Sequence, residues 1–123
     1  MTLVEVLVAC VICTICLYAI VGVIAAAQTA TIKGDYFNVA NKAAADVLAA
    51  DEAAGYAALT SGTTTSSVTG LPSGTLTVTV GPLNGNPANT NIKEIDAVVT
   101  WTGGNGPASL GGQVSLSTCV SAP

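Results

Sequence analysis

Histidine is absent from the 123-residue sequence, and basic and aromatic residues are scarce. Without histidine, the chain lacks the usual general base and the commonest metal ligand, which disfavours an enzyme. Three basic residues against seven acidic ones give a net charge of −4, so no basic patch can neutralise the phosphates of a nucleic acid. Aromatic residues make up 4% of the chain, too few for a stacked ladder that conducts electrons.

Charged residues of either sign are also scarce. They make up 8% of the chain, against about 25% in typical soluble domains, whereas 50% of the residues are hydrophobic. This balance predicts that part of the chain lies in lipid or in an assembly. The length allows one domain with a modest core and not two independent folds.

The apolar excess is concentrated near the N-terminus. No charged residue occurs between Glu5 and Lys33, and residues 6–27 are rich in valine, isoleucine, leucine, cysteine and alanine. A helix of about 20 such residues crosses the hydrocarbon core of a bilayer. A signal peptide has a basic segment before a shorter apolar core, whereas nothing basic precedes Leu3, so we expect a retained helix.

The helix is expected to continue beyond the apolar run. Residues 33–59 are rich in alanine, the best helix former, and no proline precedes Pro72. Apolar residues repeat on one helical face at Tyr36, Ala40, Ala43, Val47, Ala50 and Ala54. The first expected stops are Gly55 and the cluster at residues 60–62. At 1.5 Å per residue such a helix is about 80 Å long, which a small monomer cannot bury.

Three later segments alternate apolar and polar residues with the period of a strand. They are residues 75–80, 94–101 and 113–119. The glycine- and proline-rich segment 103–107 links the second to the third, which are expected to pair antiparallel. Residues 68–71 are expected to add a fourth edge strand, and residues 63–67 and 84–91 to form exposed loops.

The predicted fold class is therefore α+β. A long N-terminal helix, apolar in its first half, packs by its amphipathic second half on a small antiparallel sheet. We divide the chain into residues 1–32, a hydrophobic membrane or filament-core helix, and residues 33–123, a globular head.

The first nine residues, MTLVEVLVA, resemble the mature N-terminus of type IV pilins and of type II secretion pseudopilins. They share Thr-Leu-x-Glu and a glutamate at the fifth position of an apolar helix. The family more often has phenylalanine at the first position, where this sequence has Met1. A long helix followed by a small sheet is also the family layout. Residues 96–101 and the closing Val-x-Leu-x-Thr strand are similar to those of pilin-like proteins that carry a V-x-V-x-W strand.

This resemblance implies a subunit of a homo-oligomeric helical filament, with no cofactor, no metal and no catalytic residue. In the family a prepilin peptidase removes a short basic leader and the new terminal amine is methylated, which implies Met1 as the methylated first residue. The subunit is expected in the inner membrane before the pilus assembly machinery moves it into an extracellular pilus on the cell surface. Related helices often lose regularity in the apolar half, where Thr14 and Gly22 are weak helix formers here.

Glu5 is the candidate assembly residue, together with the amine of Met1. A carboxylate near the centre of a membrane helix costs about 2.5–3.5 kcal/mol on insertion scales, so it is expected to have a partner. Because nothing basic precedes Lys33, we expect no partner in the same chain, and a pairing with Met1 of a neighbouring subunit that sets the register of assembly. The alternative places Glu5 at the membrane interface, where the helix dipole favours an anion in the first turn.

The four cysteines do not form a recognisable metal motif. Cys10, Cys13 and Cys16 drift around a helix at about 100° per residue, and Cys119 lies in another region. A structural zinc site needs four ligands, usually arranged by a loop. We expect the first three to act as small hydrophobic residues in a helix bundle, with metal binding, redox chemistry or lipidation as alternatives. Cys119 is expected to be a free thiol.

Other candidate sites have simpler explanations. Asp51 and Glu52 point about 100° apart on a helix, which favours a solvated face over a catalytic pair. Trp101 is expected to fill the core rather than to anchor a ligand. The hydroxyl cluster at residues 63–67 indicates an exposed loop or an acceptor of O-linked glycans. The asparagines within residues 84–91 lack the carboxylates of a strong calcium site and indicate a turn-rich loop.

Three functional classes fit these observations. The leading one is a structural pilus subunit whose function is self-assembly, in a filament that serves adhesion, motility, DNA uptake or secretion. The alternative is a pseudopilin or minor pilin that primes or tips a short fibre of a type II secretion or pilus assembly system. The third is a non-assembling single-pass membrane protein with a small binding ectodomain, for which Glu5 has no role.

Overall fold

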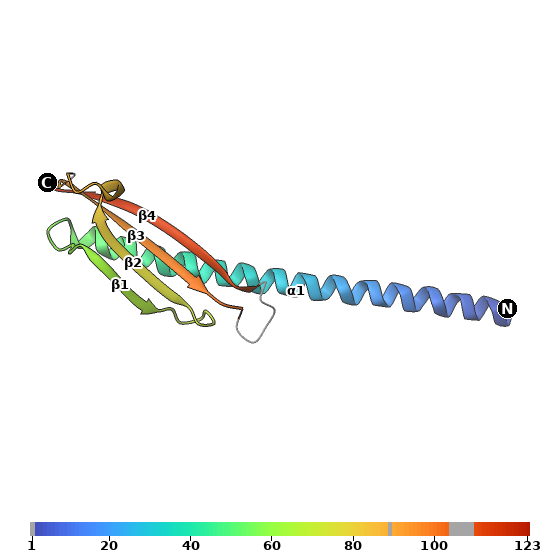
Figure 1. Ribbon diagram of the computed structural model, residues 1–123. Helices are drawn as coiled ribbons and strands as arrows, with labels where there is room; N and C mark the ends of the chain where they lie inside the picture. The colour runs from blue at the N-terminus through green and yellow to red at the C-terminus, as the bar shows by residue number, and fades with distance from the viewer. Residues whose placement is uncertain (1, 89, 104–109) are drawn as a thin grey trace. The chain divides into compact units, whose positions relative to one another are not determined.

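The computed structural model describes residues 2–88, 90–103 and 110–123 (Figure 1). By internal contacts the chain separates into two compact units, Met1–Lys33 and Gly34–Pro123. In chain order, the described elements are α1 (Leu3–Ala54), β1 (Gly62–Ser67), β2 (Thr75–Pro82), the short 3₁₀ turn η1 (Leu83–Gly85), β3 (Ile92–Trp101) and β4 (Gly112–Ser121).

Helix α1 runs for 52 residues without a proline, and alanine is frequent in its second half. It ends at the first predicted stop. Gly55 has a φ of +78°, in the left-handed region, and its N–H donates to the carbonyl of Glu52 at 3.2 Å. Glycine adopts this conformation without the steric cost that a Cβ atom brings, and so it commonly terminates helices.

The threonine hydroxyl groups in the uncharged stretch of α1 are bonded within the helix itself. The hydroxyl of Thr14 donates to the carbonyl of Val11 at 2.7 Å, and those of Thr29 and Thr31 donate to carbonyls one turn back at 3.0 Å. Such back-bonding removes the need for water around a threonine side chain. These residues are therefore compatible with an apolar environment.

The four strands form one antiparallel sheet in the order β1-β2-β3-β4. Each strand pairs with the next along the chain, and the longest ladder joins β3 to β4 from Ile92↔Ser121 to Trp101↔Gly112. Residues 34–54 of α1 cover one face of this sheet, here called the inner face (Figure 1). The α+β class predicted from the sequence is confirmed.

The position of the fourth strand differs from the prediction. Residues 63–67, expected as a loop, belong to β1, whereas residues 68–71 form a turn in which Gly70 has a φ of +91°. Threonine favours strands because its branched side chain suits the pleated surface. Residues 63–67 show no alternation of apolar and polar residues, because every residue of β1 is polar or glycine and exposed.

The core of the second unit lies between residues 34–54 of α1 and the inner face of the sheet. Ala40 and Ala44 on the helix, and Ile95, Ala97 and Val99 on β3, are completely buried. The two alanines are one turn apart on the same side of the helix, and both belong to the same core as the three β3 residues.

The buried face of the helix is narrower than the sequence pattern predicted. Ala40 and Val47 belong to the packed side, but Ala50 and Ala54 are exposed. At about 100° per residue, Ala50 lies on the opposite side of Ala40 from the buried Leu48. Ala54 follows the last buried residue of the helix, so it has no sheet residue to cover it.

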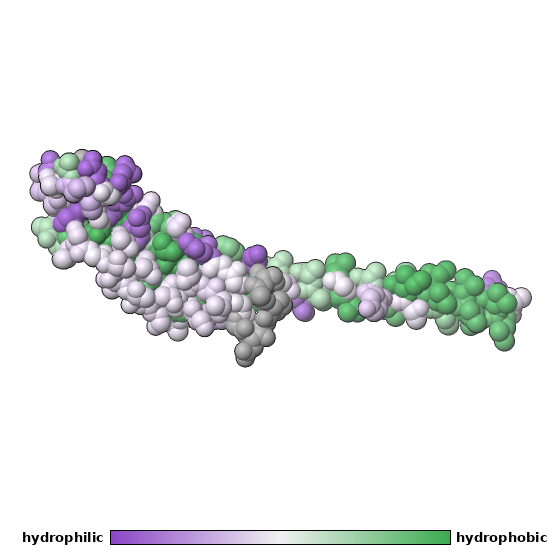
Figure 2. All heavy atoms as spheres, viewed as in Figure 1, coloured by the Kyte–Doolittle hydropathy of each residue, from purple (hydrophilic) through white to green (hydrophobic). Residues whose placement is uncertain are grey.

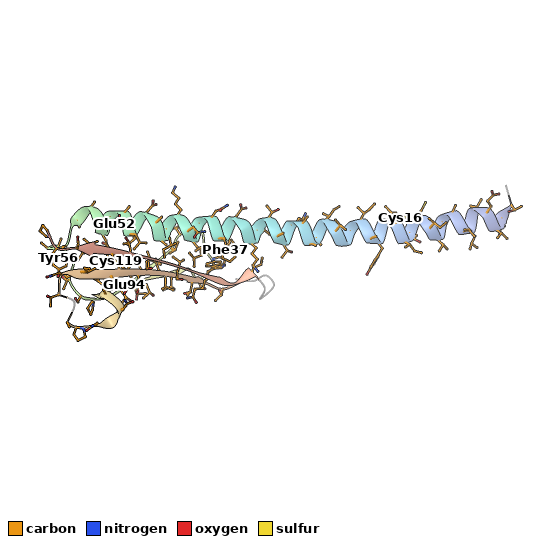
Figure 3. The ribbon with its side chains drawn as sticks, turned by 90° about the horizontal axis from the view of Figure 1, so that it is seen from above. Cys16, Phe37, Glu52, Tyr56, Glu94 and Cys119 are labelled. Atoms are coloured by element: carbon orange, nitrogen blue, oxygen red, sulfur yellow. The ribbon has the colours of Figure 1, made fainter. Side chains whose placement is uncertain are left out.

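Trp101 fills one end of this core, as expected from the sequence. Its side chain is 4% exposed, and its ring meets that of Phe37 edge-to-face at 5.0 Å between centroids. Figure 3 shows Phe37 between α1 and the strands. The indole N–H donates to the carbonyl of Leu110 at 2.8 Å, which satisfies its one polar atom.

We predict that Gly112→Ala destabilises the head, because a Cβ atom at this position would lie 2.6 Å from the indole of Trp101. Overpacking of this kind costs about 1–3 kcal/mol in the free energy of unfolding. Urea unfolding of the detergent-solubilised chain, followed by the fluorescence of Trp101, its single tryptophan, measures the change. Gly81→Ala is the matched control, because no atom lies within 4 Å of its added Cβ. Equal midpoints for the two variants would contradict the prediction.

A second prediction concerns the helix after assembly. In the structure α1 is regular through Thr14 and Gly22. We expect it to lose regular hydrogen bonds between these residues once subunits pack together, since glycine costs about 1 kcal/mol relative to alanine in a helix. A filament map is the measurement. Unbroken i to i+4 bonds from Thr2 to Ala50 in that map would rule the prediction out.

Candidate functional site

The first half of α1 is apolar on every side and has no packing of its own. Each residue from Thr2 to Gln28 is exposed, and the large hydrophobic side chains between Leu3 and Ile24 are 46–86% accessible. Figure 2 shows the hydrophobic colour over most of the visible side of this part of the helix. By length and composition this stretch is able to cross a membrane. A helix that is apolar all round lies in lipid or among other helices.

Glu5 lies in the first turn of α1 and has a partner within its own chain. The backbone N–H of Thr2 donates to its Oε2 at 3.4 Å, and the carbonyl of Thr2 accepts the N–H groups of Glu5 and Val6 at 3.1 and 3.3 Å. This is the glutamate half of a capping box, in which a carboxylate three residues into the helix bonds the N-cap backbone.

The expectation that Glu5 has no partner in its own chain is therefore wrong. The sequence signal was Thr-x-x-Glu, the spacing of a capping box, rather than a nearby base. The bond is long and exposed, and of the two carboxylate oxygens only Oε2 accepts it. The carboxylate thus remains accessible to a second donor. Met1, the predicted partner and methylation site, lies outside the described residues.

Thr14 and Gly22 lie in this same apolar unit. The hydroxyl of Thr14 is bonded within its own turn, and a Cβ atom at Gly22 would meet nothing within 4 Å. Neither residue is strained in the isolated subunit. The helix surface at these two positions is exposed and available for packing.

The cysteines are divided between the two units. Cys10, Cys13 and Cys16 are exposed on the apolar half of α1, where Figure 3 labels Cys16. Cys119 is exposed on β4, opposite Glu94 of β3. Among the described residues, no three histidine, cysteine, aspartate or glutamate side chains are grouped so that they could hold a metal ion.

The acidic pair at the end of α1 does not converge. Glu52 accepts a hydrogen bond from the hydroxyl of Thr118, which ties the helix to β4. Asp51 instead lines a shallow groove beside β1 and β2. In the loop of residues 84–91, the side-chain oxygen of Asn86 accepts the N–H of Ala88 at 3.0 Å. Asn89 of the same loop lies outside the described residues.

Lys93 makes structural contacts that the sequence did not predict. It lies on the inner face of β3, where its ammonium group donates to the carbonyls of Tyr56 and Leu59 at 3.1 and 2.5 Å. The same group is 4.2 Å from the centre of the Tyr56 ring, and the Tyr56 hydroxyl donates to the carbonyl of Thr90. These contacts hold residues 56–59, the segment after α1, against β3. The available signal was a charged residue at an inward position of the strand pattern.

No protein-family model, curated protein or solved structure matches the chain. The resemblance to pilins therefore depends on the N-terminal residues, on residues 96–101 with the closing strand, and on the helix-and-sheet layout.

The positions of the cysteines lead to a prediction for the purified protein. We expect all four to be reduced and unliganded, because Cys10, Cys13 and Cys16 are spread along one helix and Cys119 belongs to the other unit. Intact-mass measurement with and without reductant, with metal analysis of the same sample, tests this. A mass lower by two hydrogens before reduction, a covalent dimer or stoichiometric zinc would each contradict it.

Proposed function

We propose that this protein is a structural subunit that self-assembles through its N-terminal helix into an extracellular filament of the type IV pilus kind. The observation that carries the proposal is the fully exposed, all-round apolar surface of α1 from Thr2 to Gln28, joined to a head that has its own buried core. A single-pass membrane protein with a small ectodomain would share both of these features. The resemblance at the first nine residues adds the assembly role.

The energetics favour two successive environments for this helix. Burying one large aliphatic side chain yields about 1.5–3 kcal/mol, and the exposed side chains include leucines, valines and isoleucines on all sides. Lipid offers this burial before assembly, in the inner membrane. Neighbouring helices offer it afterwards, in the filament core. A prepilin peptidase and an assembly machinery are the partners that such a route requires.

Glu5 supplies register in this proposal. Apolar side chains alone let long helices slide past each other with little change in energy, whereas an ion pair forms at one stagger. Two opposite charges about 4 Å apart interact by about 4 kcal/mol at an effective dielectric of 20, before desolvation is subtracted. The accessible carboxylate of Glu5 is then a partner for the amine of Met1 in the next subunit.

We predict that Glu5→Gln and Glu5→Ala sharply reduce surface filaments while the subunit stays inserted and its head folded. Glu5→Asp should be intermediate, because its side chain is shorter. Filaments are counted by electron microscopy, and subunit levels in the membrane by immunoblot. N-terminal mass spectrometry of the filament subunit shows whether it begins with a methylated Met1.

The capping bond in the structure makes Glu5→Gln the decisive variant. Glutamine keeps an acceptor for the N–H of Thr2 but removes the charge, whereas alanine removes both. Loss of filaments in both variants assigns the role to the charge. Loss only in Glu5→Ala would assign it to helix capping, and normal filaments in both would show that Glu5 has no role in assembly.

A further inference from the structure

Both edges of the sheet in the head are open. Among the described residues, β1 pairs only with β2, and β4 pairs only with β3. Each edge therefore presents a row of backbone N–H and C=O groups with no partner strand. Natural proteins usually protect such edges with charged residues, proline, bulges or a covering segment, because an open edge pairs readily with another strand.

In this sheet the edge strands lack the residues that usually protect an edge. The edge strands β1 and β4 contain no charged residue and no proline. The charged residues of the sheet all lie on β3, a central strand; they are Lys93, Glu94 and Asp96. The two edge strands therefore have no charged residue or proline that would prevent pairing with a neighbouring strand.

The topology determines which strand fits. The four strands alternate in direction, so β1 and β4 run in opposite directions. When a second head with the same orientation is placed beside the first, its β1 lies antiparallel to β4. Subunits of a filament with an inserted helix share one orientation along the fibre. Addition of a second copy therefore extends an antiparallel sheet without turning any subunit over.

The side chains at the two edges are also complementary. Beside β1, a groove of about 270 Å³ is lined by apolar residues that include Val47, Leu59 and Val78, and also by Asp51 of α1. The inner-face residues of β1 are only hydroxyls and glycine and leave this groove exposed. On β4, the inner-face residues Val114 and Leu116 are half-buried and border the open edge. When two edges meet, these apolar residues cover the groove.

We propose that β1 of one subunit pairs antiparallel with β4 of its neighbour, so that the heads form a continuous sheet with the second halves of their α1 helices on the inner side. The partner is a second copy of this chain. Each addition leaves a free β1 at one end and a free β4 at the other, which is an open-ended, head-to-tail contact. This inference rests on the proposed filament function and specifies how neighbouring heads join.

A native residue makes the contact testable. On β4, Cys119 lies on the outer face of the sheet, the face turned away from α1. The outer-face residues of β1 are Thr63, Thr65 and Ser67, since their partners on β2 are the outward-facing Thr79, Thr77 and Thr75. Directly opposed residues of an antiparallel pair have Cα atoms about 4.5–5.5 Å apart, within the range that a disulfide bridges.

The experiment introduces Thr63→Cys, Thr65→Cys and Ser67→Cys one at a time in the full chain and oxidises the purified filaments. We expect at least one variant to give a ladder of dimers and higher multimers on a non-reducing gel. Cys119→Ser in the same background must abolish the ladder, although Cys10, Cys13 and Cys16 remain. Thr64→Cys on the inner face and Thr77→Cys on β2 are matched controls and should stay monomeric.

A charge at the edge gives a second test that needs no disulfide. Thr65→Lys places a lysine on β1, whereas Thr77→Lys places the same charge on the same face of the inner strand β2. Thr65→Lys should lose filaments and Thr77→Lys should keep them, at equal subunit levels and equal unfolding midpoints.

The outcomes separate the two proposals. Normal filaments that remain monomeric on the gel in all three cysteine variants, or equal assembly of the two lysine variants, would overturn edge pairing and leave the filament function standing. The absence of filaments from the unmodified chain would overturn the proposed function and this inference together. A ladder that depends on Cys119 establishes the contact.

Discussion

A helix whose first half is apolar on every side cannot remain in water, and the rest of the molecule is organised around this constraint. Its backbone groups are bonded along the helix, and the threonine hydroxyls within the apolar stretch are bonded to its own carbonyls. The stretch therefore offers hydrocarbon and almost no free polar group. Lipid tails and the apolar sides of other helices are equivalent surroundings for it, which is the basis of the two-stage route that we propose.

The head is stable for a separate reason, because it closes its own core. Ala40 and Ala44 bring the second half of α1 against β3, and Trp101 fills one end of the interface. At the other end, Lys93 holds the segment that follows the helix. The first half of α1 contributes nothing to this core, which leaves it free to serve assembly. Glu5 likewise serves two purposes in our proposal, because one oxygen caps its own helix while the carboxylate stays accessible.

The fold class, the long helix and its end at Gly55 were predictable from the sequence because they depend on local chemistry: alanine content, missing prolines and a glycine stop. The strands β2, β3 and β4 were predictable from the alternation of apolar and polar residues. Strand β1 did not, since a strand exposed on both faces needs no apolar residue. The contacts of Lys93 and Glu52 were also unpredictable, because each joins residues more than 30 positions apart. At Glu5 the Thr-x-x-Glu spacing of a capping box was present in the sequence, and the structure forms the bond that it predicts.

The outer face of the sheet has a consequence for the medium in which the protein works. It consists mainly of threonine and serine hydroxyls, and the only charges on it are the carboxylates of Glu94 and Asp96. Over the strands, Figure 2 shows mainly pale surface. Dissolved salt weakens attraction between exposed charges beyond about 8–10 Å at physiological ionic strength, but it does not screen hydrogen bonds between neutral hydroxyls. The solvation of this face therefore depends little on the salt concentration of the surrounding medium.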